Sequence, residues 1–382
     1  MKIGIPKEIV PGELRVSLVP DAVKNLVDQG MQVTVESGAG AASLFTDDMY
    51  ISAGATTVDN PQDLYSSAEL YLKVQAPVID NADRQNEVSM MAEGSTVIGL
   101  LQPMTNIELV KKLLQKNITA LSMDTIPRIA RAQSMDALSS QSSIAGYKSV
   151  LIAADRLGIY LPMMMTAAGT YPPAKGLVLG AGVAGLQAIA TGRRLGAVMQ
   201  AFDVRPSVKQ EVESLGGIFV GMTPDGEDVQ DSGGYAKELQ KDAQEIGRQL
   251  IQKHSAESDF VISTAMIPGK PAPTLITEQM VRSMKPGSII IDIAAETGGN
   301  CELTIPGEET VIQDVTIYGK LNLPSTMPNH ASQMYSKNIS ALLMHVLDDN
   351  ILSLDFNDAI SNGCCITYQG TVVNEATKSL IG

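Results

Sequence analysis

Three glycines with the spacing Gly180-x-Gly182-x-x-Gly185 form the segment whose chemistry is easiest to infer. In this pattern the first glycine allows a tight turn, the second lets the main chain approach a pyrophosphate, and the third lets a helix pack closely on the preceding strand. The first turn of that helix offers N–H groups and the positive end of its dipole to phosphate oxygens. We predict a dinucleotide-binding turn that includes Val183 and Ala184; the alternative is a helix-opening turn without a ligand.

Asp203 is the second feature of this predicted site, because it ends an apolar segment and lies 18 residues beyond Gly185. A carboxylate at this position accepts hydrogen bonds from the hydroxyls of the adenosine ribose. It also repels a 2′-phosphate, which favours NAD(H) over NADP(H). Arg205 lies close enough in sequence to soften that preference, although a surface arginine is the more common explanation.

The sequence offers few groups for the acid–base catalysis that hydride exchange with a carbonyl, imine or alcohol requires. None of its histidines, His254, His330 and His345, follows a predicted strand, and only His330, in a predicted loop, has scope for a functional role. The other candidate acids and bases are Lys73, Asp124, Asp136, Asp292 and Glu296. Buried ion pairs would explain several of these equally well. Hydride transfer directly between two nicotinamide rings needs no such group, because neither ring gains or loses a proton.

A polar segment at 128–139 has the donors that such an alignment of rings would need. The residues assigned to this role are Arg128, Gln133, Asp136 and Ser139. The arginine and glutamine can hydrogen-bond a carboxamide or a phosphate, the aspartate can pair with Arg128 or Arg131, and the serine can cap the helix that follows. The alternative is that Ser134 or Asp136 does no more than cap that helix.

The elements that position these residues form two series of alternating strands and helices. The strands predicted from short apolar runs are 2–5, 32–36, 70–74, 96–101, 118–123, 176–179, 198–203, 260–263, 288–292 and 316–319. The helices predicted from apolar periodicity are 21–29, 106–115, 183–195 and 335–347, with a further helix after the polar segment that links two domains. Such an order is typical of parallel sheets covered by helices on both faces.

We therefore predict an α/β protein with two Rossmann-like, doubly wound parallel-sheet domains and a cleft between them. The first domain is discontinuous, with residues 1–138 and 325–382, and the second, residues 139–324, binds the nucleotide. Between them the sequence passes Pro172-Pro173, which we interpret as a boundary.

Composition limits the classes of function. A chain of 382 residues suits two domains. With 28 basic and 42 acidic residues its net charge is −14, which disfavours nucleic-acid and anionic-lipid partners. The three cysteines, Cys301, Cys364 and Cys365, have no disulfide or metal spacing, and we expect Cys364 and Cys365 to be small buried residues. The apolar run 159–168 is too short to span a membrane, and the first residues do not resemble a signal peptide.

Long segments across nearly the whole chain resemble the NAD(H)-binding component, domain I, of the proton-translocating NAD(P) transhydrogenases. These segments are IPKE at 5–8, PRIARAQSMDALSSQSSIAGY at 127–147, PMMMTAAGT at 162–170, GAGVAGLQAIATGRRLGA at 180–197, SGGYAKE at 232–238, TAMIPGKPAP at 264–273 and MKPGSIIIDIAAETGGN at 284–300. They are longer and more unusual than the glycine pattern, so the resemblance is the more specific signal.

The resemblance implies roles for individual residues. It assigns catalytic alignment of the nicotinamide and its ribose to Arg128, Gln133, Asp136 and Ser139. The other nucleotide contacts that it implies are Gly180, Gly182, Val183, Ala184, Gly185, Asp203, Val204, Arg205, Tyr235, Thr264 and Ala265. The tyrosine belongs to a mobile loop in this family, which favours a lid over a disordered insertion for the acidic segment 220–235. No metal is expected.

The family also implies partners and a location. NAD(H) is held by this chain and NADP(H) by domain III on a partner subunit, and membrane-spanning subunits couple the hydride transfer to proton translocation. A homodimer at the cytoplasmic face of the membrane is implied, peripheral to it through those partners.

Alanine dehydrogenase, which shares the fold, is the alternative. Arg15 and Lys73 match positions at which that enzyme holds a substrate carboxylate. Its catalytic histidine should fall near 100–103, where this chain reads Leu-Leu-Gln-Pro, and its active-site aspartate falls near Glu296. The missing histidine favours the transhydrogenase component, and Arg15 and Lys73 are then structural or help to seal the cleft.

Overall fold

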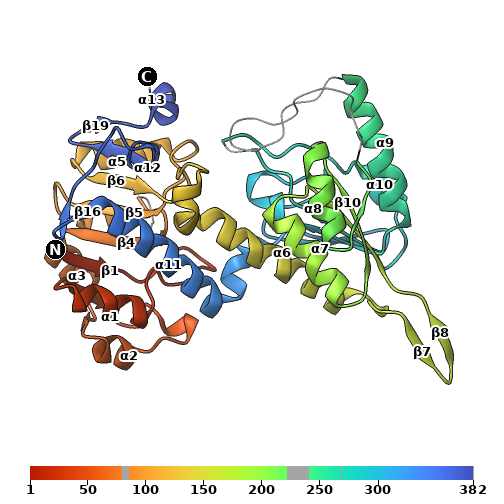
Figure 1. The fold of residues 1–382 in the computed structure, drawn as a ribbon, viewed down its shortest axis with the longest axis horizontal. Helices are drawn as coiled ribbons and strands as arrows, with labels where there is room; N and C mark the ends of the chain where they lie inside the picture. The colour runs from red at the N-terminus through yellow and green to blue at the C-terminus, as the bar shows by residue number, and fades with distance from the viewer. Residues whose placement is uncertain (80–85, 222–240, 268, 382) are drawn as a thin grey trace. The chain divides into compact units, whose positions relative to one another are not determined.

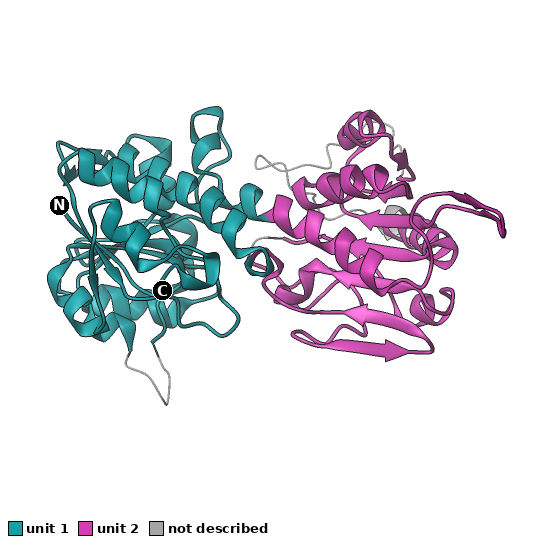
Figure 2. Ribbon diagram, turned by 90° about the horizontal axis from the view of Figure 1, so that it is seen from below, with its two compact units in different colours: residues 1–141, 325–382 teal, residues 142–324 magenta. Residues whose placement is uncertain are grey.

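The computed structural model describes residues 1–79, 86–221, 241–267 and 269–381, which form two compact units. Unit 1 comprises Met1–Gln141 and Ser325–Gly382, and unit 2 comprises Ser142–Pro324 (Figure 2). The long helix α6 (Ala137–Arg156) begins in unit 1 and continues into unit 2.

Unit 1 is built on an eight-stranded sheet with the order β19-β18-β6-β5-β4-β1-β2-β3. Its strands are β1 (Lys2–Ile5), β2 (Gln32–Glu36), β3 (Thr56–Val58), β4 (Leu70–Gln75), β5 (Thr96–Leu100), β6 (Thr119–Ser122), β18 (Cys365–Tyr368) and β19 (Thr371–Val372). The strands from β6 to β3 in this order are parallel, and β18 and β19 extend the sheet as antiparallel strands. The chain fills the sheet outward from β1 on one side and then from β4 on the other, which is the doubly wound arrangement.

Helices cover both faces of this sheet because successive strand residues point to opposite sides. In β4, Leu70 and Leu72 enter one core with α1 (Pro20–Asp28) and α11 (Pro328–Val346), while Tyr71 enters the other core with α3 (Pro61–Ser67) and α5 (Ile107–Gln115) (Figure 1). The remaining helices are α2 (Asp47–Ser52), α4 (Glu87–Met90), α12 (Ala359–Cys364) and α13 (Glu375–Ile381). Cys364 and Cys365 are fully buried, as predicted.

Unit 2 repeats this plan with a seven-stranded sheet of order β11-β10-β9-β12-β13-β15-β14. Its strands are β9 (Lys175–Leu179), β10 (Val198–Phe202), β11 (Ile218–Phe219), β12 (Phe260–Ser263), β13 (Ile289–Asp292), β14 (Glu309–Ile312) and β15 (Val315–Tyr318). Only β14 is antiparallel. Its helices after α6 are α7 (Val183–Arg194), α8 (Lys209–Ser214), α9 (Lys241–Glu257) and α10 (Glu278–Arg282). The predicted fold class, two doubly wound parallel-sheet units, is confirmed.

Two small hairpins have no counterpart among the predicted elements. The strands β7 (Met164–Thr166) and β8 (Gly169–Tyr171) pair just before the predicted boundary at Pro172-Pro173, and β16 (Leu347–Asp348) pairs with β17 (Ile351–Leu352) after α11. These strands have two or three residues each, too few to show an alternating pattern. In the portion of the chain that the structure describes, no helix is both long and apolar enough to cross a lipid bilayer.

Candidate nucleotide-binding site

The glycine turn joins β9 to α7, and its three glycines are required for three different reasons. Gly180 has a φ of +95°, which favours glycine, and a Cβ there would lie 2.7 Å from Thr264 Oγ1. A Cβ on Gly185 would overlap the carbonyl oxygen of Gly180, so the helix could not lie this close to the strand. Gly182 has an ordinary φ of −81°, and no atom of the described chain lies within 4 Å of the Cβ position.

The contrast at Gly182 is informative, because nothing within the described chain demands a glycine there. The residue is the N-cap of α7, and its side chain makes no capping hydrogen bond. Serine, threonine, aspartate and asparagine are favoured at such a position when only the helix matters. A glycine that is unexplained by its own chain fits a main chain left bare for a close ligand, as the fingerprint predicts.

The turn lies at the topological switch point of the unit 2 sheet, between β9 and β12, where α/β folds bind their ligands. Thr264, the first residue after β12, donates its main-chain N–H to Leu179 O at 2.8 Å and its hydroxyl to Gly180 O at 2.9 Å. This second bond fixes the carbonyl of the glycine with the left-handed backbone. Thr264 therefore holds the turn in place, and the structure brings it beside Gly180 as the predicted set required.

Ala265, the next predicted contact, is held by a residue that the sequence analysis did not single out. The fully buried side chain of Asn300 accepts from Ala265 N at 3.0 Å and donates to Ala265 O and Pro273 O, both at 2.8 Å. Both main-chain polar groups of Ala265 are thus engaged within unit 2. Asn300 belongs to the segment 284–300 that carries the family resemblance, but no local spacing signals a bond that joins two loops 35 residues apart.

Asp203 follows β10 and connects the glycine turn to its own loop. It accepts from Ala181 N at 2.7 Å, from Arg205 N and Nε at 2.9 Å each, and from Arg205 Nη2 at 2.8 Å. Val204 lies between the two, half-buried. The ion pair with Asp203 raises the pKa of Arg205 above its ordinary value, so this guanidinium keeps its charge. Arg205 is therefore not a solvated surface arginine but the ion-pair partner of the predicted ribose contact.

Main-chain contact also fixes α6 against α7. A Cβ on Gly146 would overlap the carbonyl oxygen of Ala184, a predicted member of the turn. The helix that follows the polar segment thus packs directly on the first turn of the predicted phosphate-binding helix. The next residue of the set, Val183, is exposed.

The polar segment of unit 1 forms a 3₁₀ turn, Ala130–Met135, that leads into α6. Asp136 caps α6: its carboxylate accepts from Ser139 N at 2.8 Å and from Ser139 Oγ at 2.6 Å. The alternative role that the sequence allowed, a helix cap, is therefore real. It does not remove the other role, since Arg128 and Gln133 on the same segment are exposed.

The predicted pairing of Asp136 with Arg131 is wrong. Arg131 Nη2 instead donates to Asp358 Oδ1 at 2.7 Å, because Asp358, the N-cap of α12, lies nearer than the capping carboxylate. Asp358 also contacts His345 Nε2 at 2.9 Å, and these donors hold its pKa below the ordinary value despite partial burial. The C-terminal segment of unit 1 thereby anchors the polar segment, a contact across 227 residues that spacing could not reveal.

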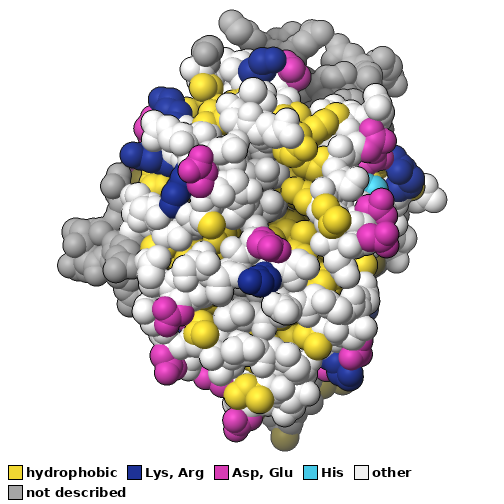
Figure 3. Space-filling model, turned by 90° about the vertical axis from the view of Figure 1, so that its left-hand side faces the viewer, with side chains coloured by type: hydrophobic (Ala, Val, Ile, Leu, Met, Phe, Trp, Pro, Cys, Tyr) yellow, Lys and Arg dark blue, Asp and Glu magenta, His cyan; other side chains and the backbone are white. Residues whose placement is uncertain are grey.

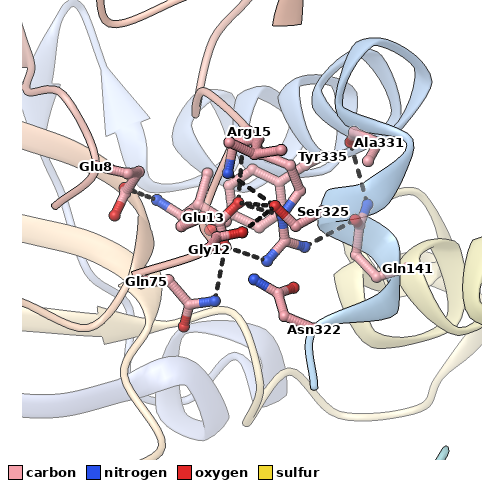
Figure 4. Close-up of polar contacts among 12 residues, drawn as sticks. Glu8, Gly12, Glu13, Arg15, Gln75, Gln141, Asn322, Ser325, Ala331 and Tyr335 are labelled. Atoms are coloured by element: carbon pink, nitrogen blue, oxygen red, sulfur yellow. Dashed lines mark hydrogen bonds and ion pairs between the residues drawn. The ribbon is translucent and has the colours of Figure 1, made fainter. Parts of the chain in front are cut away.

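Arg15 is a structural residue of unit 1 in this structure. Its guanidinium forms a bidentate pair with Glu13 at 2.8 and 2.6 Å and donates to Gln141 Oε1 at 2.9 Å (Figure 4). Although burial alone would raise it, the hydrogen bonds from Arg15 lower the pKa of Glu13 to about 2. Ser325 donates to Gly12 O and Glu13 Oε1, so both ends of unit 1 at its chain crossings, Gln141 and Ser325, bond to this loop.

Lys73 is likewise enclosed by carboxylates. Its ammonium group lies 2.8 Å from Glu87 Oε1 and 3.3 Å from Glu8 Oε2, with all three side chains almost completely buried. Burial raises the pKa of Glu8 to about 7, more than the nearby lysine lowers it. Burial alone would lower the pKa of Lys73, but the two carboxylates outweigh it and keep the lysine charged.

The other candidate acids and bases serve the fold. Asp292, at the end of β13, accepts from Ser263 Oγ, Ala294 N, Cys301 N and Thr304 Oγ1, and Asp124 accepts from Leu101 N and Ser122 Oγ. Glu296 accepts from Asn322 N at 2.8 Å. His330 lies on the first turn of α11, not in a loop, because Pro328 starts that helix. His254, on α9, contacts Gln200 Oε1 at 2.9 Å.

Tyr235 and almost all of the predicted lid at 220–235 lie outside the described residues, so the lid stays a prediction. The largest groove of the described chain, about 840 Å³, lies in unit 1 between α1, residues 45–49 and α11, and it includes none of the predicted site residues. Figure 3 draws a face on which basic side chains stand singly among acidic and uncharged ones.

Comparison with known proteins places this geometry. Two family models match the chain, the alanine dehydrogenase/PNT N-terminal domain over residues 4–145 and the alanine dehydrogenase/PNT C-terminal domain over residues 149–375. The chain belongs to the alanine dehydrogenase/PNT family. Within this family it is 46% identical to an NAD(P) transhydrogenase subunit alpha chain of Rhodospirillum rubrum, over 98% of each chain.

Family members of both kinds share its structure. The transhydrogenase from Sinorhizobium meliloti superposes with a TM-score of 0.85 at 40% identity, over 98% of this chain and 100% of that one. An L-alanine dehydrogenase superposes with a TM-score of 0.83 at 26% identity, over 100% and 99%. In sequence, the alanine dehydrogenase of Staphylococcus saprophyticus is 31% identical over 94% of this chain and 93% of its own. The transhydrogenase resemblance and the oxidoreductase class predicted from it are confirmed, with alanine dehydrogenases as the more distant relatives.

Proposed function

We propose that this chain is the NAD(H)-binding component of a proton-translocating transhydrogenase. The observation that carries the proposal is the turn at Gly182: the main chain is bare at the N-terminus of α7, and its neighbours Gly180 and Gly185 are locked by sterics. Pyrophosphate oxygens of NAD(H) would accept hydrogen bonds from the N–H groups of this turn. Asp203, at the end of the adjacent strand β10, would receive the adenosine ribose.

The polar segment of unit 1 would align the nicotinamide. Arg128 and Gln133 are exposed donors, and Asp136 and Ser139 are held rigidly by their mutual hydrogen bonds. In the proposed reaction a hydride leaves C4 of the reduced nicotinamide with its electron pair and bonds C4 of the oxidised NADP ring on the partner subunit. No proton moves in this step, so the candidate acids and bases can all be structural, as their contacts indicate.

The proposal extends to the assembly. NADP(H) would be held by a domain III subunit, and membrane-spanning subunits at the cytoplasmic face would couple the exchange to proton translocation. A homodimer is supported by the β7–β8 hairpin, which exposes Met163, Met165 and Tyr171. No charged residue occurs from Ile159 to Ala174, and a two-stranded hairpin is marginal in water by itself. Such a surface is suited to cover by a second copy.

The decisive experiment is stopped-flow hydride exchange between an NADH analogue and NADP⁺ after mixing this chain with an NADP(H)-binding transhydrogenase component. We expect rapid exchange that requires both proteins and does not depend on any titrating side chain of this chain. Oxidation of L-alanine with NAD⁺ by the isolated chain would instead establish the alanine dehydrogenase activity. Tight NADH binding with no exchange would identify a nucleotide-binding protein without turnover.

A further inference from the structure

The carboxylate of Asp203 is already saturated by donors from its own unit. A carboxylate has about four lone-pair sites for hydrogen bonds. In this chain they receive Ala181 N, the main-chain N–H of Arg205 and two nitrogens of its guanidinium, all at 2.7–2.9 Å. Ribose hydroxyls can reach this carboxylate only if the guanidinium gives up some of its contact.

The same contact removes the charge on which discrimination against a 2′-phosphate depends. The side chains of Asp203 and Arg205 are 4% and 15% exposed, so little water screens their attraction. Together they present a neutral pair at the end of β10, where a lone aspartate would present a negative charge. A phosphate on the 2′-position would meet this neutral pair, with a guanidinium whose planar fork also suits phosphate oxygens.

We propose that Arg205 is a specificity-determining residue, which weakens the preference for NAD(H) over a 2′-phosphorylated nucleotide by neutralising Asp203. The inference rests on the proposed function and names the residue pair that sets nucleotide preference within it. Asp203 supplies the selection for the ribose diol, and Arg205 limits how strong that selection becomes.

The test is a double-mutant cycle on Asp203 and Arg205, read out as the ratio of the dissociation constant for NADPH to that for NADH. The ratio cancels any general attraction of Arg205 for the pyrophosphate that both nucleotides carry. In Arg205→Met we expect the ratio to rise by about tenfold or more, because the uncompensated Asp203 then repels the 2′-phosphate. In Asp203→Asn the ratio should fall.

The double variant identifies the mechanism. If Arg205 acts by neutralising Asp203, the change from Arg205→Met should disappear when Asp203 is already asparagine. Persistence of the full change in that background, or an unchanged ratio in Arg205→Met itself, overturns the inference. Arg205→Lys, which keeps the positive charge, should stay near the wild-type ratio and serves as the second variant if methionine leaves the buried carboxylate too costly for folding.

Arg282→Met is the matched control, because Arg282 pairs with Glu278 on α10 and is distant in sequence from the turn. It should leave the ratio unchanged. The two proposals fail separately. A wild-type chain that exchanges hydride but whose ratio ignores Arg205 overturns only the role of Arg205. Ratios that behave as expected in a chain that exchanges no hydride would overturn only the proposed function.

Discussion

The two regions assigned to the nucleotide are held in opposite ways. In unit 2, the turn at 180–185 is fixed by main-chain sterics and by buried hydrogen bonds from Thr264 and Asn300. In unit 1, the segment at 128–139 presents exposed side chains and is anchored by the cap at Asp136 and by the ion pair of Arg131. The first region depends on the absence of side chains, and the second depends on their presence.

This difference separates two tasks. A preformed turn binds a group that is the same in every nucleotide, the pyrophosphate, and it gains from rigidity. A segment of exposed donors suits a ring whose position must match a second ring on another protein. We therefore expect substitutions in unit 2 to act on binding and substitutions in the polar segment to act on transfer.

The largest effect is expected from Gly185→Ala. The new Cβ overlaps the Gly180 carbonyl oxygen, so α7 must move away from β9 and the turn loses its geometry. Displacement by about 1 Å at such a site costs on the order of 100-fold. We expect NADH affinity, measured by titration of nucleotide fluorescence, to fall by at least that factor.

Gly182→Ala is the matched comparison. Its Cβ enters space that the described chain leaves open, so the melting temperature should stay at the wild-type value while NADH affinity falls. Equal melting temperatures with equal NADH affinity would remove the reason for assigning this glycine to a ligand.

A smaller effect, confined to transfer, is expected at Asp136. Asparagine caps helices as well as aspartate does, so Asp136→Asn keeps α6 intact and removes only the charge. We expect NADH affinity within about twofold of wild type and a hydride-transfer rate lower by about tenfold or more in stopped-flow exchange. Asp136→Ala should add a loss of about 1 kcal/mol in stability. If only the alanine variant slows transfer, the residue is a helix cap and nothing more.

Unit 1 also has a buried carboxyl with a raised pKa, which makes its stability depend on pH. Glu8 keeps its proton up to about pH 7 when folded and releases it near 4.5 when unfolded. Its stabilising contribution is therefore complete below 4.5 and is lost as the pH rises through 7, a change of up to about 3 kcal/mol. Glu8→Gln should flatten the denaturation profile between pH 5 and 8. Profiles that match wild type across this range would mean that Glu8 does not titrate there.

The smallest effect is expected at Arg131, whose side chain is largely exposed. Exposed ion pairs contribute about 0–1 kcal/mol, so Arg131→Ala should shift the melting temperature by a few degrees at most. Because the pair anchors the polar segment, transfer should still slow by about twofold to fivefold while NADH affinity holds. A change in affinity instead of rate would erase the distinction between the two regions.

Sequence alone reveals those regions of the molecule that depend on local spacing. Apolar runs locate β1, β2 and β12 to the residue, and the glycine spacing identifies the turn, because both signals lie within a few neighbouring positions. The partners of Arg131 and Ala265 cannot be found in this way, since the bonds to Asp358 and Asn300 join segments that only the fold brings together. For Arg205, residue type and position favour a solvated surface side chain, and only the folded loop after β10 shows its ion pair with Asp203.

The packing of Gly146 on Ala184 limits how this protein can be redesigned. Where two helices touch through bare backbone, neither can be enlarged without prising them apart, so the cradle itself offers no room for tuning by side-chain size. An engineer who wishes to change the preferred coenzyme must leave α6 and α7 as they are and work at the neighbouring loop after β10. The scaffold is thus conservative at its centre and adjustable at one rim.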